Sequence, residues 1–167
     1  MSINNPKEMF VLLLSDVRRK TERSIDFYTE ASKLAEEPEI KEAIDARAFV
    51  AQKSLDKIDE AFRLISQKPV PLTGRTEEVF VEDFRRELAE IKSPVVRRIF
   101  VLSKLMHLTH WRIGEYMALV AAADTTGNFG VGVLLESCLG DYLAFVERNR
   151  RIIRKLAEMK ATTKATA

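Results

Sequence analysis

The chain has 167 residues, of which 46% are hydrophobic and 31% charged, a balance typical of one globular domain with a sizeable core. Its net charge of +2 is too small to indicate a nucleic-acid-binding protein. The single cysteine, Cys138, excludes a disulfide framework within the chain and fits the reducing cytoplasm, where we expect this protein. The apolar run at residues 9–14 is too short for a signal peptide, and we expect no membrane-spanning segment.

Apolar residues recur every three or four positions along most of the chain, the spacing of one face of an α-helix. This pattern predicts helices, in chain order, over residues 10–32, 40–65, 76–90, 99–120 and 134–156. The segment 76–90 is shorter than the others, and no segment alternates with the period of two that is typical of a strand. Four long amphipathic helices can bury their apolar stripes together only as a bundle. We therefore predict an all-α domain over residues 1–160, built from two helical hairpins, and a flexible tail over 161–167.

Polar residues interrupt the apolar stripes at comparable depth in all four long helices. A plain bundle would have leucine and isoleucine at these positions. The interrupting residues are Thr21, Glu22, Arg47, Thr109, His110, Arg112, Glu136 and Asp141. Such a polar layer is typical of centres in which inward-facing carboxylates and histidines hold two iron or manganese ions. Cys138 lies in an apolar run of the same layer, and we interpret it as a small buried hydrophobe.

The two histidines, His107 and His110, are three residues apart, and Glu115 follows them. Two histidines with this helical spacing can share one metal ion, but a stable site needs further ligands. Glu115 is poorly placed as a third ligand, and His107 points away from the inward stripe. We therefore favour two ordinary histidines, with His110 close to the core, and no metal.

Three stretches resemble the YciE/YciF-type ferritin-like proteins, a bacterial stress-associated family. SPVVRRIFVLSKLMHLTHWRIGEYMAL resembles the third helix of that family, and LLESCLGDYLAFVERN resembles its fourth helix. DVRRKTERSIDFYTEASKLAEEPEIKEAI resembles the first helix and the following turn. The likeness extends over about residues 8–158. It implies a ferritin-like four-helix bundle, with residues 76–90 as an extra helix in the connection, and a role in stress.

The resemblance also identifies positions that correspond to metal ligands of the family. These positions are Glu22, Arg47, Val50, Thr109, His110, Arg112, Glu136 and Asp141. Arg47 stands at a histidine position, and Thr109 and Arg112 stand at glutamate positions. Arginine has no lone pair to give to a metal. The resemblance therefore implies a retained scaffold with a degenerate metal centre, without cofactor, metal or catalytic residues.

We predict that arginine takes the place of the metal. Arg47 and Arg112 would bridge the acidic residues Glu22, Glu136 and Asp141, which would otherwise repel one another. In this hypothesis Arg47 lies within hydrogen-bond reach of a carboxylate on another helix, with Glu22 as the favoured partner. His110 would be a neighbour of the network, and His107 would lie outside it.

The sequence thus favours a non-enzymatic bundle with a structural or partner-binding role. Leftover apolar residues such as Phe80, Val81 and Phe84 make us expect a homodimer, or binding to another protein, rather than to nucleic acid or a membrane. The alternative function is a metal-binding or redox protein of the di-metal type. Its reduced site would be built from Glu22, His110, Glu136 and Asp141.

Overall fold

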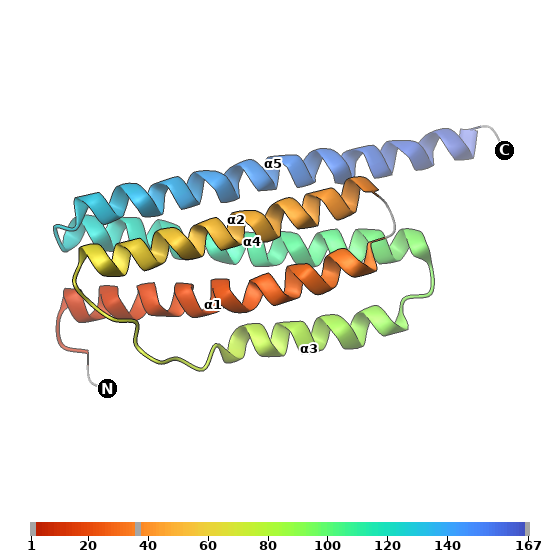
Figure 1. The fold of residues 1–167 in the computed structure, drawn as a ribbon. Coiled ribbons are helices and arrows are strands. Elements are labelled where there is room, and N and C mark those ends of the chain that lie inside the picture. Colours follow the sequence, from red (N-terminus) through yellow and green to blue (C-terminus); the bar gives the residue numbers. More distant parts are fainter. Residues whose placement is uncertain (1–2, 36–37, 166–167) are drawn as a thin grey trace.

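Four long helices lie side by side in this protein, and a fifth, shorter helix runs along the outside of the first (Figure 1). The computed structural model describes residues 3–35 and 38–165, with side chains up to residue 155. Its elements are α1 (Pro6–Leu34), α2 (Pro38–Leu64), α3 (Arg75–Glu90), α4 (Pro94–Thr125) and α5 (Phe129–Ala165). The described residues contain no strand, and every predicted helix is present.

The helices pair as the sequence predicted. The most extensive packing joins α1 to α2 and α4 to α5, so each pair forms a hairpin. The hairpins meet through α2 with α5 and α1 with α4, and α3 lies in the connection between them (Figure 1). The chain is therefore an all-α bundle of two hairpins with an extra helix in the link.

The ends of the helices follow from local chemistry. The Asn5 side chain accepts a hydrogen bond from the backbone N–H of Glu8 at 2.9 Å, and Pro6 occupies the first turn of α1. Pro94 likewise opens α4. Gly127, which has a φ of +74°, allows the chain to turn directly after α4, a backbone conformation that costs glycine little.

The apolar core is divided into two clusters along the bundle. One cluster includes Phe27, Phe84 and Leu102, so it fixes α3 to α1 and α4. The other includes Leu14 and Ile58 near the opposite end. Each of the four long helices has a polar or phenolic buried residue near its midpoint: Thr21, Arg47, Thr109 with Arg112, and Tyr142. This middle layer is the candidate site.

Helix α5 departs from two expectations. It continues through Ala165, into the segment for which the sequence predicts a tail, while residues 166–167 lie outside the described part. The last part of α5 lacks glycine and proline, and alanine and lysine are strong helix formers. In addition, Phe129–Lys155 is long and apolar enough to cross a membrane by length and composition, contrary to the sequence analysis. Here this segment packs along α4 and α2 as a bundle helix.

The thiol of Cys138 is fully buried, as predicted, in the cluster that contains Tyr116 and Tyr142. Burial raises the pKa of this thiol, which further reduces the fraction of reactive thiolate.

We therefore expect Cys138 to react with a thiol reagent only when the protein unfolds. The measurement is the labelling rate in buffer and in increasing urea, with fully unfolded protein as the reference for complete labelling. Labelling of the native protein as fast as that of the unfolded chain would contradict the buried position.

Candidate functional site

Two arginines lie fully inside the bundle. Arg47 on α2 has 0% of its surface exposed, and Arg112 on α4 has 1%. The guanidinium group keeps its charge at any physiological pH, so it cannot lower the cost of burial by losing a proton. Each buried arginine therefore needs compensation from its surroundings. The two residues obtain it in different ways.

Arg112 is held by carboxylates. Its Nη2 donates to Glu77 Oε1 at 2.9 Å and to Ser24 Oγ at 3.2 Å, and its Nη1 donates to Glu115. Glu77 belongs to the first turn of α3 and is only 2% exposed. Burial opposes the charged form of Arg112, but Glu115 and Glu77 outweigh it, and the pKa of the guanidinium is raised. This buried pair joins α3 to α4.

The network continues from Arg112 toward the surface. Lys20 Nζ lies 2.7 Å from Glu115 Oε1 and 2.7 Å from Asp16 Oδ2. Burial alone would lower the pKa of Lys20, but Asp16 and Glu115 raise it above the ordinary value. Glu115 is thus shared between two cations, and the chain of charges ties α1 to α4.

Arg47 is surrounded by aromatic rings instead. Its Cζ lies 4.0 Å from the ring centroid of Tyr142, 4.8 Å from that of Tyr28 and 5.6 Å from that of Phe145. These distances are in the range of cation–π attraction. None of its three nitrogens has a hydrogen-bond partner among the described residues. The prediction that Arg47 reaches a carboxylate of another helix is therefore wrong.

The expected partner of Arg47 faces outward. Glu22 follows the inward-facing Thr21, and one residue turns a helix by about 100°. The side chain of Glu22 is 44% exposed and pairs with Arg19 at 2.7 Å. Replacing Arg47 would therefore not leave Glu22 as a buried carboxylate without a partner.

The acidic residues of α5 also lie outside the centre. Glu136 is exposed. Asp141 is half-exposed and lies 3.1 Å from Lys57 Nζ. Both are therefore excluded from the predicted bridge with Arg47 and Arg112.

The remaining predicted positions are divided between core and surface. Thr109 is buried and donates to the backbone carbonyl of Leu105 at 2.7 Å, while Val50 is partly buried. His107 is exposed, as predicted. His110 is exposed as well, and its Nδ1 lies 2.8 Å from the carbonyl oxygen of Met106 within the same helix. The expectation that His110 adjoins the buried network is wrong.

The donor set of this layer does not fit a metal pair. A di-iron or di-manganese centre needs several carboxylates and histidines pointing inward. Within residues 3–35 and 38–165, no group of three or more histidine, cysteine, aspartate or glutamate side chains is placed to hold a metal ion. The centre offers guanidinium groups, phenols and hydroxyls instead, so no chemistry through a metal follows from it.

Glu77 and Glu115 are not among the predicted partners of Arg112. Glu77 belongs to the short helix α3, whose sequence pattern indicates only an apolar side. A signal existed nonetheless, because an inward arginine at position 112 requires a carboxylate nearby. Glu115, three residues after Arg112, lies on the same face of the helix.

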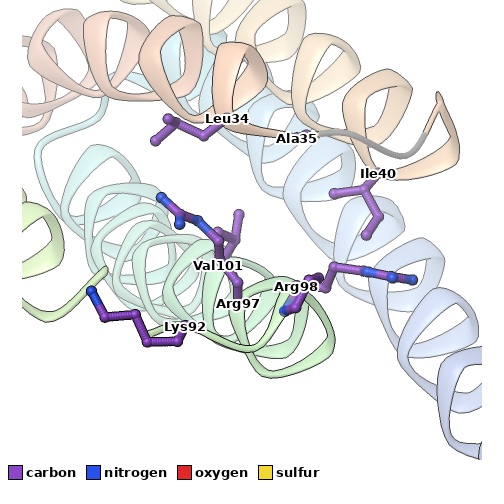
Figure 2. Close-up of a pocket in the computed structure, with 8 residues that line it drawn as sticks. Leu34, Ala35, Ile40, Lys92, Arg97, Arg98 and Val101 are labelled. Carbon is purple, nitrogen blue, oxygen red and sulfur yellow. The ribbon is translucent and has the colours of Figure 1, made fainter. Parts of the chain in front are cut away.

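A separate basic pocket of about 170 Å³ lies at one end of the bundle, where α1 ends and α4 begins (Figure 2). Lys92, Arg97 and Arg98 line it, together with the apolar side chains of Ile40 and Val101. Its cations are exposed or only partly buried, unlike the two central arginines. The pocket is therefore a solvated basic surface rather than a desolvated site.

The buried network makes a direct prediction for Glu77→Gln. Removing this charge leaves Arg112 in the core with only the shared Glu115, and we expect a loss of about 3 kcal/mol in the free energy of unfolding. The matched control is Glu78→Gln, because Glu78 pairs with Arg23 at the surface, and we expect a loss below about 1 kcal/mol. Urea unfolding followed by circular dichroism measures both. Equal losses in the two variants would contradict the assigned burial.

Comparison with known proteins identifies the family. Residues 5–162 match the family described as a domain of unknown function, DUF892, whereas no curated protein matches. The fold is similar to that of the E. coli stress protein YciF, with a TM-score of 0.88 and 16% identity over 93% of this chain and 99% of that one. It is also similar to YcfI, a candidate structural protein from Rhodopseudomonas palustris, with a TM-score of 0.85 and 16% identity over 89% of this chain and 95% of that one. A protein from Xanthomonas campestris has a TM-score of 0.70 and 19% identity over 94% and 99% of the two chains. The chain therefore belongs to the DUF892 family and is of the YciF type that its sequence resembles.

Proposed function

We propose that this protein is a non-enzymatic, cytoplasmic ferritin-like bundle in which buried arginines stand in place of a metal centre. Its role in this proposal is structural or partner-binding and is linked to stress. The observation that carries the proposal is the Arg112–Glu77 pair, in which both side chains are buried. It lies in the middle layer of the bundle, where a ferritin-like protein would hold its metal ions.

Electrostatics supports the absence of metal chemistry. Two guanidinium groups in one layer raise the potential there, and a divalent cation would have to enter against it without a carboxylate shell. Arg112 already uses Glu77 and Glu115 as its own partners. Oxygen chemistry at iron would in addition need open coordination positions and a set of ligands, and the described residues contain no group of side chains placed to provide them.

The network supports a structural role because it connects elements that the apolar core joins only in part. Glu77 anchors the start of α3 to α4, while Phe84, further along α3, packs into the apolar cluster. A polar anchor and an apolar anchor on one helix define both its position and its rotation. We propose that this arrangement gives α3 a single docking geometry.

The solved relatives are consistent with this role. YciF is a stress protein, and YcfI is described as a candidate structural protein. At 16% identity these relatives show the fold alone, and we propose that the present chain shares their role.

The alternative function required a reduced metal site built from Glu22, His110, Glu136 and Asp141. His110 and Glu136 are exposed, and Glu22 and Asp141 already pair with Arg19 and Lys57. The four side chains do not form a metal-binding group in the described structure. The geometry therefore favours the non-metal function.

Metal content tests the proposed function. We expect protein purified from cells supplied with iron, manganese and zinc to contain far less than one equivalent of any of them, measured by mass spectrometry of the elements. Anaerobic addition of Fe²⁺ or Mn²⁺ should leave the melting temperature unchanged. One or two equivalents that survive gel filtration and are lost in His110→Ala would favour the alternative instead.

We also propose that this protein forms a homodimer, through α5 rather than through the apolar residues of α3. Phe84 is fully buried, and Phe80 and Val81 pack partly buried against the core, so these three residues are not a free apolar face. The most exposed large apolar side chains of the described part are on α5: Phe129 is 67% exposed and Val133 is 66% exposed. They lie one helical turn apart.

Charge along α5 favours a second copy as the partner. Its first half has the exposed Glu136, and its second half has exposed basic residues such as Arg150 and Arg151. In an antiparallel pairing of two α5 helices around a two-fold axis, the acidic half of each would face the basic half of the other. Phe129 and Val133 would be covered in the same step.

We therefore expect a homodimer in sedimentation equilibrium and a shift toward monomer in Val133→Asp. The control is Val79→Asp, because Val79 is an exposed valine on α3, outside this surface. A wild-type monomer at high concentration, or an equal effect of both substitutions, would contradict pairing through α5.

A further inference from the structure

The centre of the bundle has an excess of buried positive charge. Three charged residues are fully buried in the described part: Arg47, Glu77 and Arg112. Two are positive and one is negative. Glu77 is committed to Arg112 at 2.9 Å, so the charge without a counter-ion is that of Arg47. An isolated buried charge is costly, and arginine cannot discard its proton.

The groups around Arg47 are rich in unused hydrogen-bond donors. No hydrogen bond of good geometry from the described residues reaches the three nitrogens of Arg47 or the hydroxyls of Tyr28 and Tyr142, the two phenols whose rings contact the guanidinium. Tyr142 and Ser24 nevertheless lie close enough to influence the pKa values of Arg47 and Tyr28, respectively. On the helices of Tyr28 and Tyr142, Thr21 Oγ1 and both amide atoms of Asn149 are also buried and have no partner among the described residues. Buried polar groups are nearly always satisfied in folded proteins, so such a concentration indicates a bound species.

A phenolate does not provide the missing charge. Burial raises the pKa of Tyr28 and outweighs the opposite influence of Arg47. Tyr28 is therefore protonated at neutral pH. Moreover, Arg47 lies over the ring faces of Tyr28 and Tyr142, which is the geometry of a cation–π contact rather than of an ion pair with a phenolic oxygen. Water would satisfy hydrogen bonds, but it would not balance the charge.

We infer that Arg47, Tyr28 and Tyr142 form a buried binding site for a small monovalent anion of halide size. The guanidinium supplies the charge and N–H donors, and the phenol hydroxyls supply two further donors. The site is monovalent because one positive charge lacks a counter-ion. It favours a halide over larger organic anions because Arg47, Tyr28 and Tyr142 are all sealed from solvent.

Bromide tests this site, because it resembles chloride and scatters X-rays anomalously. The wild-type protein is unfolded in urea and refolded in sodium bromide or, at equal ionic strength, in sodium gluconate. Crystals of the bromide-refolded protein should show an anomalous peak in contact with the Arg47 nitrogens. The melting temperature should rise by about 5–10 °C once bromide reaches roughly a hundred times its dissociation constant.

Two variants separate this site from general salt effects. Arg47→Met should lose the bromide dependence of the melting temperature. Arg86→Met should keep it, because Arg86 is an exposed surface residue paired with Asp83. Water alone at Arg47 in the wild-type crystals would overturn the inference, even if Arg47→Met does not fold. Phenolate absorbance near 295 nm at neutral pH, lost in Tyr28→Phe or Tyr142→Phe, would overturn it as well.

Discussion

The constraint on which this structure depends is that a guanidinium group inside a protein stays charged. Arg47 and Arg112 occupy the middle of the bundle with almost no exposure, so the surrounding chain must compensate both. Arg112 obtains two carboxylates, one of them from α3. Arg47 obtains the faces of aromatic rings, and its nitrogens have no hydrogen-bond partner among the described residues. Two side chains of the same type therefore lie in different environments within one layer. The structural role proposed for the layer depends on the carboxylates at Arg112, and the proposed anion site depends on the lack of a carboxylate at Arg47.

The position of α3 follows from this constraint. A helix in a long connection could lie at several places on a four-helix bundle, because apolar packing is tolerant of small rotations. Glu77 must reach Arg112, and Phe84 must enter the core between α1 and α4, so few orientations satisfy both. Breaking the contact between Glu77 and Arg112 leaves the buried cation with only the shared Glu115, whereas loss of a surface pair such as Arg23–Glu78 has little effect. The buried network therefore gives α3 one defined position on the bundle.

Much of this could be predicted from the sequence, and the failures have a physical pattern. Helical periodicity predicts the five elements and the burial of Cys138, because the apolar stripe extends over many residues. The inward position of Arg47 follows from the same stripe. The partner of Arg47 does not follow from it. Thr21 and Glu22 are neighbours in the sequence, but their side chains point in directions about 100° apart, one inward and one outward. The apolar pattern does not show which of two such neighbours faces the core. Glu77 could not be paired with Arg112 from periodicity, because that contact depends on how α3 folds back onto the bundle.

We propose that the Arg112–Glu77 pair, rather than a metal, stabilises the middle of this bundle. A double-mutant cycle on Arg112 and Glu77 tests it most directly, using Arg112→Met, Glu77→Leu and the combined variant, with the free energy of unfolding measured in urea. Arg112→Met leaves the buried Glu77 without its cation, Glu77→Leu leaves Arg112 with only the shared Glu115, and the double variant removes both buried charges. We predict a coupling energy of about 2–3 kcal/mol, with the double variant losing much less stability than the two single losses added together. Losses that add to within about 0.5 kcal/mol would contradict the account.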